Sequence, residues 1–149
     1  MVQIPARIPL LKPFTVLLGV AFFIWLALEG DLRYVLTLGC LAVAVGWGQT
    51  LQRLIGGRQL RLWRFLALMV ASGAVAGLVT NLVVLILMAV KTGLHGHGPE
   101  FNQTEIEWVM AQLAPWLFIA TLIGLGVGLI IGSTTVPVQQ REESGHELR

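Results

Sequence analysis

The feature that most constrains the fold is an uncharged run of 26 residues at positions 65–90. At about 1.5 Å of rise per residue, a helix of this length crosses roughly 30 Å of hydrocarbon with some tilt. Arg64 precedes the run and Lys91 follows it. Only 12% of the chain is charged and 56% is hydrophobic, whereas a soluble domain carries about 25% charged residues. The sequence therefore predicts an integral membrane protein.

Three further apolar segments accompany this run, and together they predict an all-α bundle of four transmembrane helices. The predicted spans are residues 13–28, 34–48, 65–90 and 115–132. The first two are short for a span, which usually takes about 20 residues. They either borrow flanking residues or form a hairpin that penetrates partway. We expect residues 1–132 to form a single membrane domain and residues 133–149 a flexible cytoplasmic tail.

The first apolar run also has the arrangement of a signal peptide, because a basic leader with Arg7 and Lys12 precedes it. The run ends in Ala27-Leu28-Glu29-Gly30-Asp31, which lacks the small-x-small pattern of a cleavage site. We therefore favour an uncleaved first span.

Basic residues are distributed unevenly between the two predicted sides. With the N-terminus in the cytoplasm, eight of the ten basic residues fall inside, and only Arg33 and Lys91 fall outside. Five of the eight acidic residues also fall outside. An excess of Lys and Arg in cytoplasmic loops sets membrane orientation. The sequence thus predicts an N-in, C-in topology, in a bacterial inner membrane or an equivalent energy-transducing membrane. The net charge of +2 does not indicate a nucleic-acid partner.

Residues 49–64 form a loop that contains no acidic residue and alternates leucines with arginines. Its basic residues are Arg53, Arg58, Arg61 and Arg64. Each basic residue near anionic lipid contributes about 1 kcal/mol to membrane binding. We expect this loop to lie on lipid headgroups.

The segment before the last span predicts a short helix lying in the membrane interface. Asn102 is followed three residues later by Glu105, which is typical of a helix-capping pair. Apolar residues then recur at helical spacing. Pro115 fits either an early position of the last helix or a kink in one continuous helix.

Small residues recur at four-residue spacing in two of the predicted spans. The residues are Gly73, Gly77 and Asn81 in one span, and Gly124, Gly128 and Gly132 in the other. Small residues allow two helices to approach closely, which is a main source of association in lipid. We expect the two faces to meet, within one chain or between copies.

Two groups of polar residues are candidates for a ligand site. Asn81, at membrane depth, either bonds to a neighbouring helix or contacts a ligand or ion, because a buried amide is costly without a partner. His95, His97 and Glu100 form an HxHxxE cluster that is able to bind a metal. The alternative is a structural or capping role, since a glycine-rich loop is a poor pre-organised site. The lone Cys40 is expected to be a small buried hydrophobe.

These features favour a protein that acts by helix association rather than catalysis. Serines are few, and none has a nearby His and acid in an evident arrangement, so we do not expect an enzyme. The leading hypothesis is an accessory or assembly subunit of a larger membrane complex, or a homo-oligomer, with the bilayer and other subunits as partners. The alternatives are a small transporter or channel, with Asn81 and the histidine loop as its path, and a metal site on the outer face.

Overall fold

The computed structural model describes residues 1–28, 31–94 and 100–135, which contain five helices and two short strands. In chain order the elements are β1 (Val2–Gln3), α1 (Leu11–Ala27), α2 (Leu32–Ile55), β2 (Gln59–Leu60), α3 (Leu62–Leu94), α4 (Gln103–Ala111) and α5 (Leu113–Thr135). The prediction of an all-α fold is therefore confirmed, apart from one pair of two-residue strands. The predicted tail falls mostly at 136–149, outside the described residues.

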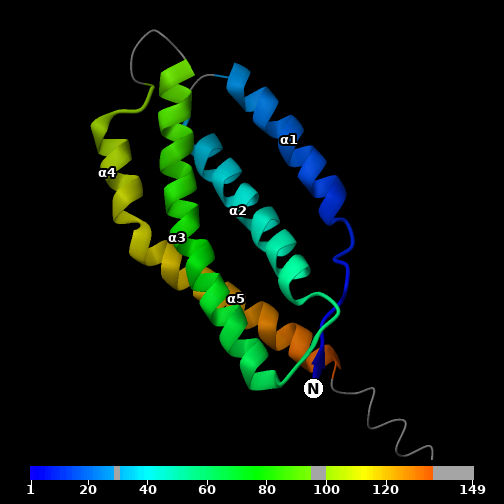
Figure 1. Cartoon of the computed structure of the whole chain (residues 1–149). Coiled ribbons are helices and arrows are strands. Elements are labelled where there is room, and N and C mark those ends of the chain that lie inside the picture. The colour runs from blue at the N-terminus through cyan, green and yellow to red at the C-terminus, as the bar shows by residue number, and fades with distance from the viewer. Residues whose placement is uncertain (29–30, 95–99, 136–149) are drawn as a thin grey trace, which may run out of the picture.

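Three of the helices, α2, α3 and α5, are long and apolar enough to cross a membrane. Helix α1 is apolar but shorter, with 17 residues. Helix α2 has 24 residues and extends well beyond the predicted segment 34–48, because no proline or glycine pair interrupts the chain before Gly56-Gly57. Helices α1 and α2 lie side by side as an antiparallel pair (Figure 1).

Helix α3 is the central element, and α5 makes the most extensive contact with it (Figure 1). Buried apolar side chains form two clusters near the two ends of α3. One cluster lies at the end of the bundle where the chain begins, which we call the N-terminal end. It contains Val2, Ile4, Ile55, Phe65 and Met69. The cluster at the opposite end contains Trp25, Val35, Leu38, Val84, Met88, Phe101 and Val109.

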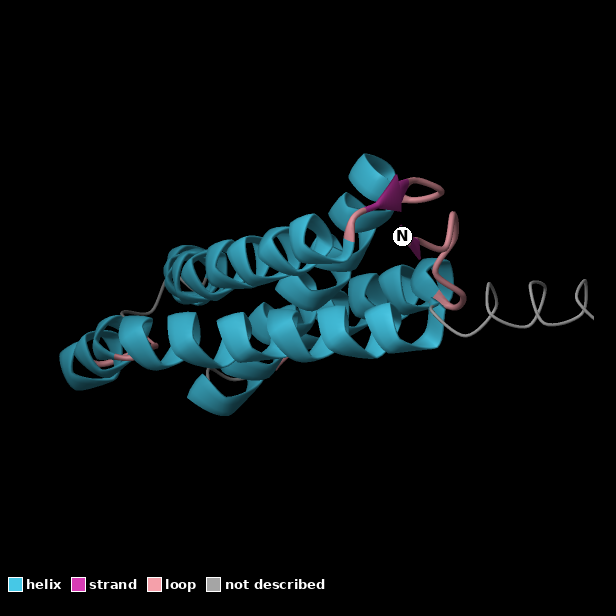
Figure 2. Cartoon of the chain, turned by 90° about the horizontal axis from the view of Figure 1, so that it is seen from below, coloured by secondary structure: helices cyan, strands magenta, loops and turns pink. Residues whose placement is uncertain are grey.

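The sequence did not predict the small sheet that closes the N-terminal end (Figure 2). Strand β1 pairs antiparallel with β2, so that Val2 faces Leu60 and Gln3 faces Gln59. The backbone N–H of Gly57 donates to the Ile4 carbonyl at 3.1 Å. Gly57 has a φ of 75°, a conformation that glycine adopts without steric cost. The segment 49–64, expected as a loop on headgroups, is mostly helical, because α2 runs to Ile55 and α3 begins at Leu62. Its strand, Gln59–Leu60, holds the start of the chain.

The predicted capping pair before α4 is confirmed. The Glu105 backbone N–H donates to Asn102 Oδ1 at 2.8 Å, and the Asn102 backbone N–H donates to Glu105 Oε2 at 2.9 Å. These reciprocal bonds satisfy donors that a helix start leaves without intrahelical partners. Pro115 is the third residue of α5, so it occupies the first turn, where its missing N–H costs nothing.

Candidate functional site

The structure brings the two glycine stripes together inside one chain, at the crossing of α3 and α5. A Cβ atom on Gly73 would lie 2.5 Å from the Ala120 carbonyl oxygen, and a Cβ on Gly77 would lie 2.5 Å from the Trp116 carbonyl oxygen. The Gly124 Cα lies 3.2 Å from the same Gly73 position. At such distances any side chain would force the helices apart, so close backbone contact is what these glycines provide.

The remaining two glycines of the α5 stripe pack against side chains rather than backbone. A Cβ on Gly128 would meet the Leu66 and Met69 side chains at 3.1 Å, and a Cβ on Gly132 would meet Leu62 at 2.9 Å. The stripe therefore follows α3 from the backbone crossing to the N-terminal end. Both predicted stripes are used within the chain, and neither is left for a partner.

Asn81 is buried, with 5% of its surface exposed, and its amide bonds to a neighbouring helix. Its Nδ2 donates to the Val109 carbonyl oxygen at 2.8 Å. The same oxygen accepts the Gln112 backbone N–H at 3.1 Å. This bond holds the end of α4 against the middle of α3. Of the two roles that the sequence left open for Asn81, a bond to a neighbouring helix or a contact with a ligand or ion, this bond is the first.

The predicted metal cluster is only partly within the described residues. His95 and His97 lie outside them, while Glu100 lies just before α4 and is half-buried. Across residues 1–28, 31–94 and 100–135, no group of three His, Cys, Asp or Glu side chains is placed to hold a metal ion. Cys40 is a free cysteine of intermediate exposure on α2.

Lys91 has a structural role that the sequence analysis missed. Its side chain is fully buried, and its Nζ donates to the carbonyl oxygens of Trp25 and Leu26, each at 3.1 Å, and of Leu28. The ammonium group also lies 5.2 Å from the centroid of the Trp25 ring, within range of a cation–π interaction. A signal for this role existed, since Lys91 is one of only two basic residues on the predicted outer side.

The four arginines expected at lipid headgroups are all exposed and lie near the N-terminal end. Arg64 lies 5.3 Å from the centroid of the Trp63 ring. Arg53 is on α2, where it lines a pocket.

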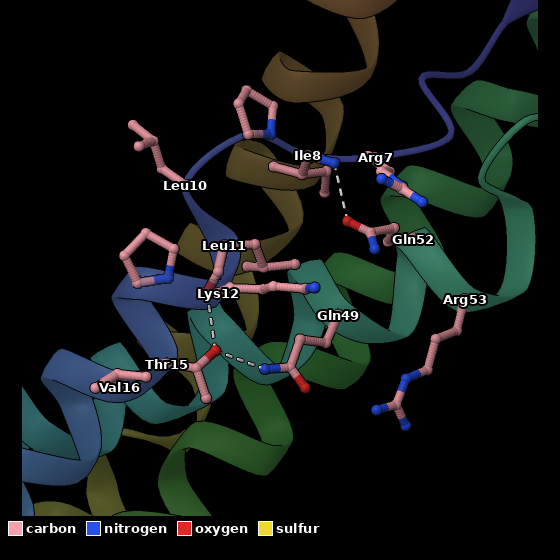
Figure 3. Close-up of a pocket in the computed structure, with 12 residues that line it drawn as sticks. Arg7, Ile8, Leu10, Leu11, Lys12, Thr15, Val16, Gln49, Gln52 and Arg53 are labelled. Atoms are coloured by element: carbon pink, nitrogen blue, oxygen red, sulfur yellow. Dashed lines mark hydrogen bonds between the residues drawn. The ribbon is translucent and has the colours of Figure 1, made fainter.

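Several hollows mark the surface of the described part of the bundle, and two of them bear on function. A groove of about 550 Å³ separates α2 from α3. We call it the α2–α3 groove, and its lining residues are Ala42, Val43, Gly46, Trp47, Thr50, Leu51, Leu54, Ile55, Leu68, Ser72, Val75, Ala76, Val79 and Val83. A second hollow of about 720 Å³ lies between the start of α1 and the end of α2 (Figure 3). We call it the N-terminal pocket. The two differ in chemistry, because basic residues line the pocket but not the groove.

These features define a small helical bundle with three helices of membrane-spanning length, tied together by a glycine crossing and by buried polar bonds. No model of a known protein family matches the chain, and neither a curated protein nor a solved structure matches it.

Proposed function

We propose that the protein is a multi-pass membrane protein that acts by helix association, as an accessory or assembly subunit of a larger complex or as a homo-oligomer. No catalytic role is part of this proposal. The observation that carries it is the α2–α3 groove, which presents small and apolar residues from two long apolar helices and no charged residue.

The groove suits a transmembrane helix of a partner subunit because small residues line both of its walls. Ala42, Gly46 and Thr50 recur at four-residue spacing on α2, and Ser72 and Ala76 do so on α3. A Cβ on Gly46 would meet no atom within 4 Å, so this wall is open. Small residues let a third helix come close to both backbones.

The hydroxyl groups in the groove are already bonded within their own helices. Thr50 Oγ1 donates to the Gly46 carbonyl oxygen at 2.8 Å, and Ser72 Oγ donates to the Met69 carbonyl oxygen at 3.1 Å. These two hydroxyl groups therefore need no hydrogen-bond acceptor from a partner helix. For the transporter alternative, the Asn81 amide is bonded to Val109, and the histidine loop lies outside the described residues.

We further propose that α1 completes a set of four membrane segments. Both termini would then lie on the cytoplasmic side of a bacterial inner membrane, or on the corresponding side of an equivalent energy-transducing membrane. The eight-to-two split of basic residues between the two sides supports this orientation. At about 1.5 Å per residue, the 17 residues of α1 extend roughly 26 Å, so its flanking residues must contribute to the span.

Photocrosslinking in native membranes tests the association proposal. A photoreactive amino acid at Val79 in the groove is expected to crosslink to a helix of another subunit or of a second copy, which mass spectrometry would identify. The same probe at Val20, which is 52% exposed on α1, serves as the lipid-facing control. Gly46→Leu should abolish the Val79 crosslink, whereas Gly19→Leu, at an equally open position on α1, should not. Crosslinks to lipid alone at both probe positions would overturn the proposal.

A further inference from the structure

Hydrogen bonds join α2 to α1 and to the segment before α1 around the N-terminal pocket (Figure 3). The Ile8 backbone N–H donates to Gln52 Oε1 at 2.8 Å. Gln49 Nε2 donates to Thr15 Oγ1 at 2.8 Å, and that hydroxyl donates to the Leu11 carbonyl at 2.8 Å. Because the Gln52 oxygen accepts from Ile8, its NH₂ group is the end available to donate to a ligand.

The pocket is positively charged. Arg7, Lys12 and Arg53 line it, and its lining includes no Asp or Glu. In Figure 3, Lys12 extends from α1 toward the two glutamines of α2, and Arg7 lies beside Gln52. Arg53, the residue after Gln52, also lines the pocket, and its guanidinium group is directed away from Arg7 and Lys12 in Figure 3. Guanidinium and ammonium groups form short, strong hydrogen bonds with phosphate oxygens, so an anion is the ligand that this charge favours.

The other half of the pocket is apolar and continues onto an exposed apolar face. Ile8, Leu10 and Val16 line the pocket, and both Leu10 and Val16 are about two-thirds exposed, at 66% and 67%. Along α1 the exposed apolar side chains continue through Leu17 and Val20. A ligand that enters the pocket therefore meets cationic groups at one end and a long apolar surface beside them.

We propose that the N-terminal pocket binds the phosphate group of an anionic phospholipid, with Arg7, Lys12 and the Gln52 amide as donors and an acyl chain along α1. A free phosphate satisfies the cationic half but leaves the apolar half without a partner, whereas a phospholipid occupies both. The site requires that the helices lie in a membrane, but it does not require a partner in the α2–α3 groove. Failure of one proposal therefore leaves the other standing.

Native mass spectrometry of the purified full-length protein in detergent tests this site. Phosphatidylglycerol should bind at a lipid concentration about tenfold lower than phosphatidylcholine does. Arg7→Gln/Lys12→Gln should remove that preference, since each charge-assisted bond to phosphate is strong. The matched control is Arg61→Gln/Arg64→Gln, which removes the same charge at the same end but outside the pocket. The control should keep the preference within about twofold, because exposed charges separated from the ligand are screened.

Three results would overturn the proposal. Equal loss in the Arg61/Arg64 control would show a diffuse surface charge instead of a site. Displacement of the lipid by inorganic phosphate would show a soluble anion as the ligand, and equal binding of phosphatidylcholine would show no anion recognition.

Arg7→Lys/Lys12→Arg keeps both charges and should keep the lipid. If Arg7→Gln/Lys12→Gln does not fold, the wild-type protein tests whether the pocket binds an anionic phospholipid. Its melting temperature should rise with phosphatidylglycerol but not with phosphatidylcholine or phosphate.

Discussion

Lys91 shows how one residue can join two helices of a bundle. Its ammonium group satisfies backbone carbonyls at the C-terminal end of α1, where a helix leaves its last carbonyls without intrahelical partners. A cation at that end also interacts favourably with the helix dipole. The indole of Trp25, itself only 3% exposed, lies beside the same cation. Lys91 therefore anchors the end of α1 to α3.

Replacing Lys91 with methionine tests this role. Lys91→Met should lower the free energy of unfolding by about 1 to 3 kcal/mol, because buried carbonyls lose their donor. Thermal unfolding in detergent micelles measures the change. Val90→Met introduces the same side chain at the adjacent position, where the native residue is 44% exposed, and should shift stability by less than about 0.5 kcal/mol. Equal effects of the two substitutions would argue against the anchoring role.

The crossing of α3 and α5 is the main packing device among the helices. In lipid, helices gain little from hydrophobic burial against one another, so close van der Waals contact must supply the association energy. Gly73, Gly77 and Gly124 supply that contact, because each lies directly against the backbone of the facing helix. Asn81 then ties α4 to the same face of α3 through the Val109 carbonyl. The order of small residues along α3 thus determines where α5 and α4 pack.

Two glycines of α5, two positions apart, allow a matched test of this crossing. Gly124→Ala should destabilise the protein by about 1 to 3 kcal/mol, because its Cβ would overlap the Met69 carbonyl oxygen. Gly126→Ala should be neutral or stabilising by up to about 1 kcal/mol, since a Cβ there would meet no atom within 4 Å and alanine favours helix. Reversible denaturation in mixed micelles gives both values. A Gly126 variant as unstable as the Gly124 variant would contradict the packing explanation.

At the scale of the whole molecule, the bundle has two chemically different ends. The N-terminal end carries the strand pair, five exposed arginines and the cationic pocket that two of them line. At the opposite end lie the end of α1, the start of α2, the buried Lys91 and the start of α4. Such asymmetry is what an oriented membrane protein needs, because basic residues favour the cytoplasmic side.

Cysteine labelling tests this orientation and the proposed span of α1. In a Cys40→Ala background, single cysteines replace Arg7, Asp31, Arg61 and Gln103, all of which are exposed. A membrane-impermeant thiol reagent should label positions 31 and 103 in intact cells, and positions 7 and 61 only after permeabilisation. Positions 7 and 31 on the same side would show that α1 does not cross. Inverse labelling of all four positions would reverse the topology.

Local features of this protein could be predicted from the sequence because they depend on neighbouring residues. The long uncharged run became α3, since hydropathy and helical rise act over a contiguous stretch. The Asn102–Glu105 capping pair was likewise readable, because both bonds join residues three positions apart. The glycine spacing indicated two faces suited to close packing. It did not say whether those faces would meet within one chain or between copies.

The contacts that decide the architecture join residues far apart in the chain, and only the tertiary structure shows them. Lys91 bonds to carbonyls more than sixty residues away, and Val2 pairs with Leu60 across the N-terminal end. The cationic pocket likewise exists only because the start of α1 lies beside the end of α2. Hydrophobic periodicity specifies which face of a helix is apolar but not which neighbour covers it. Packing of the whole chain makes that choice, so the uncharged run at 65–90 was predictable as a helix but not as the helix against which α2, α4 and α5 pack.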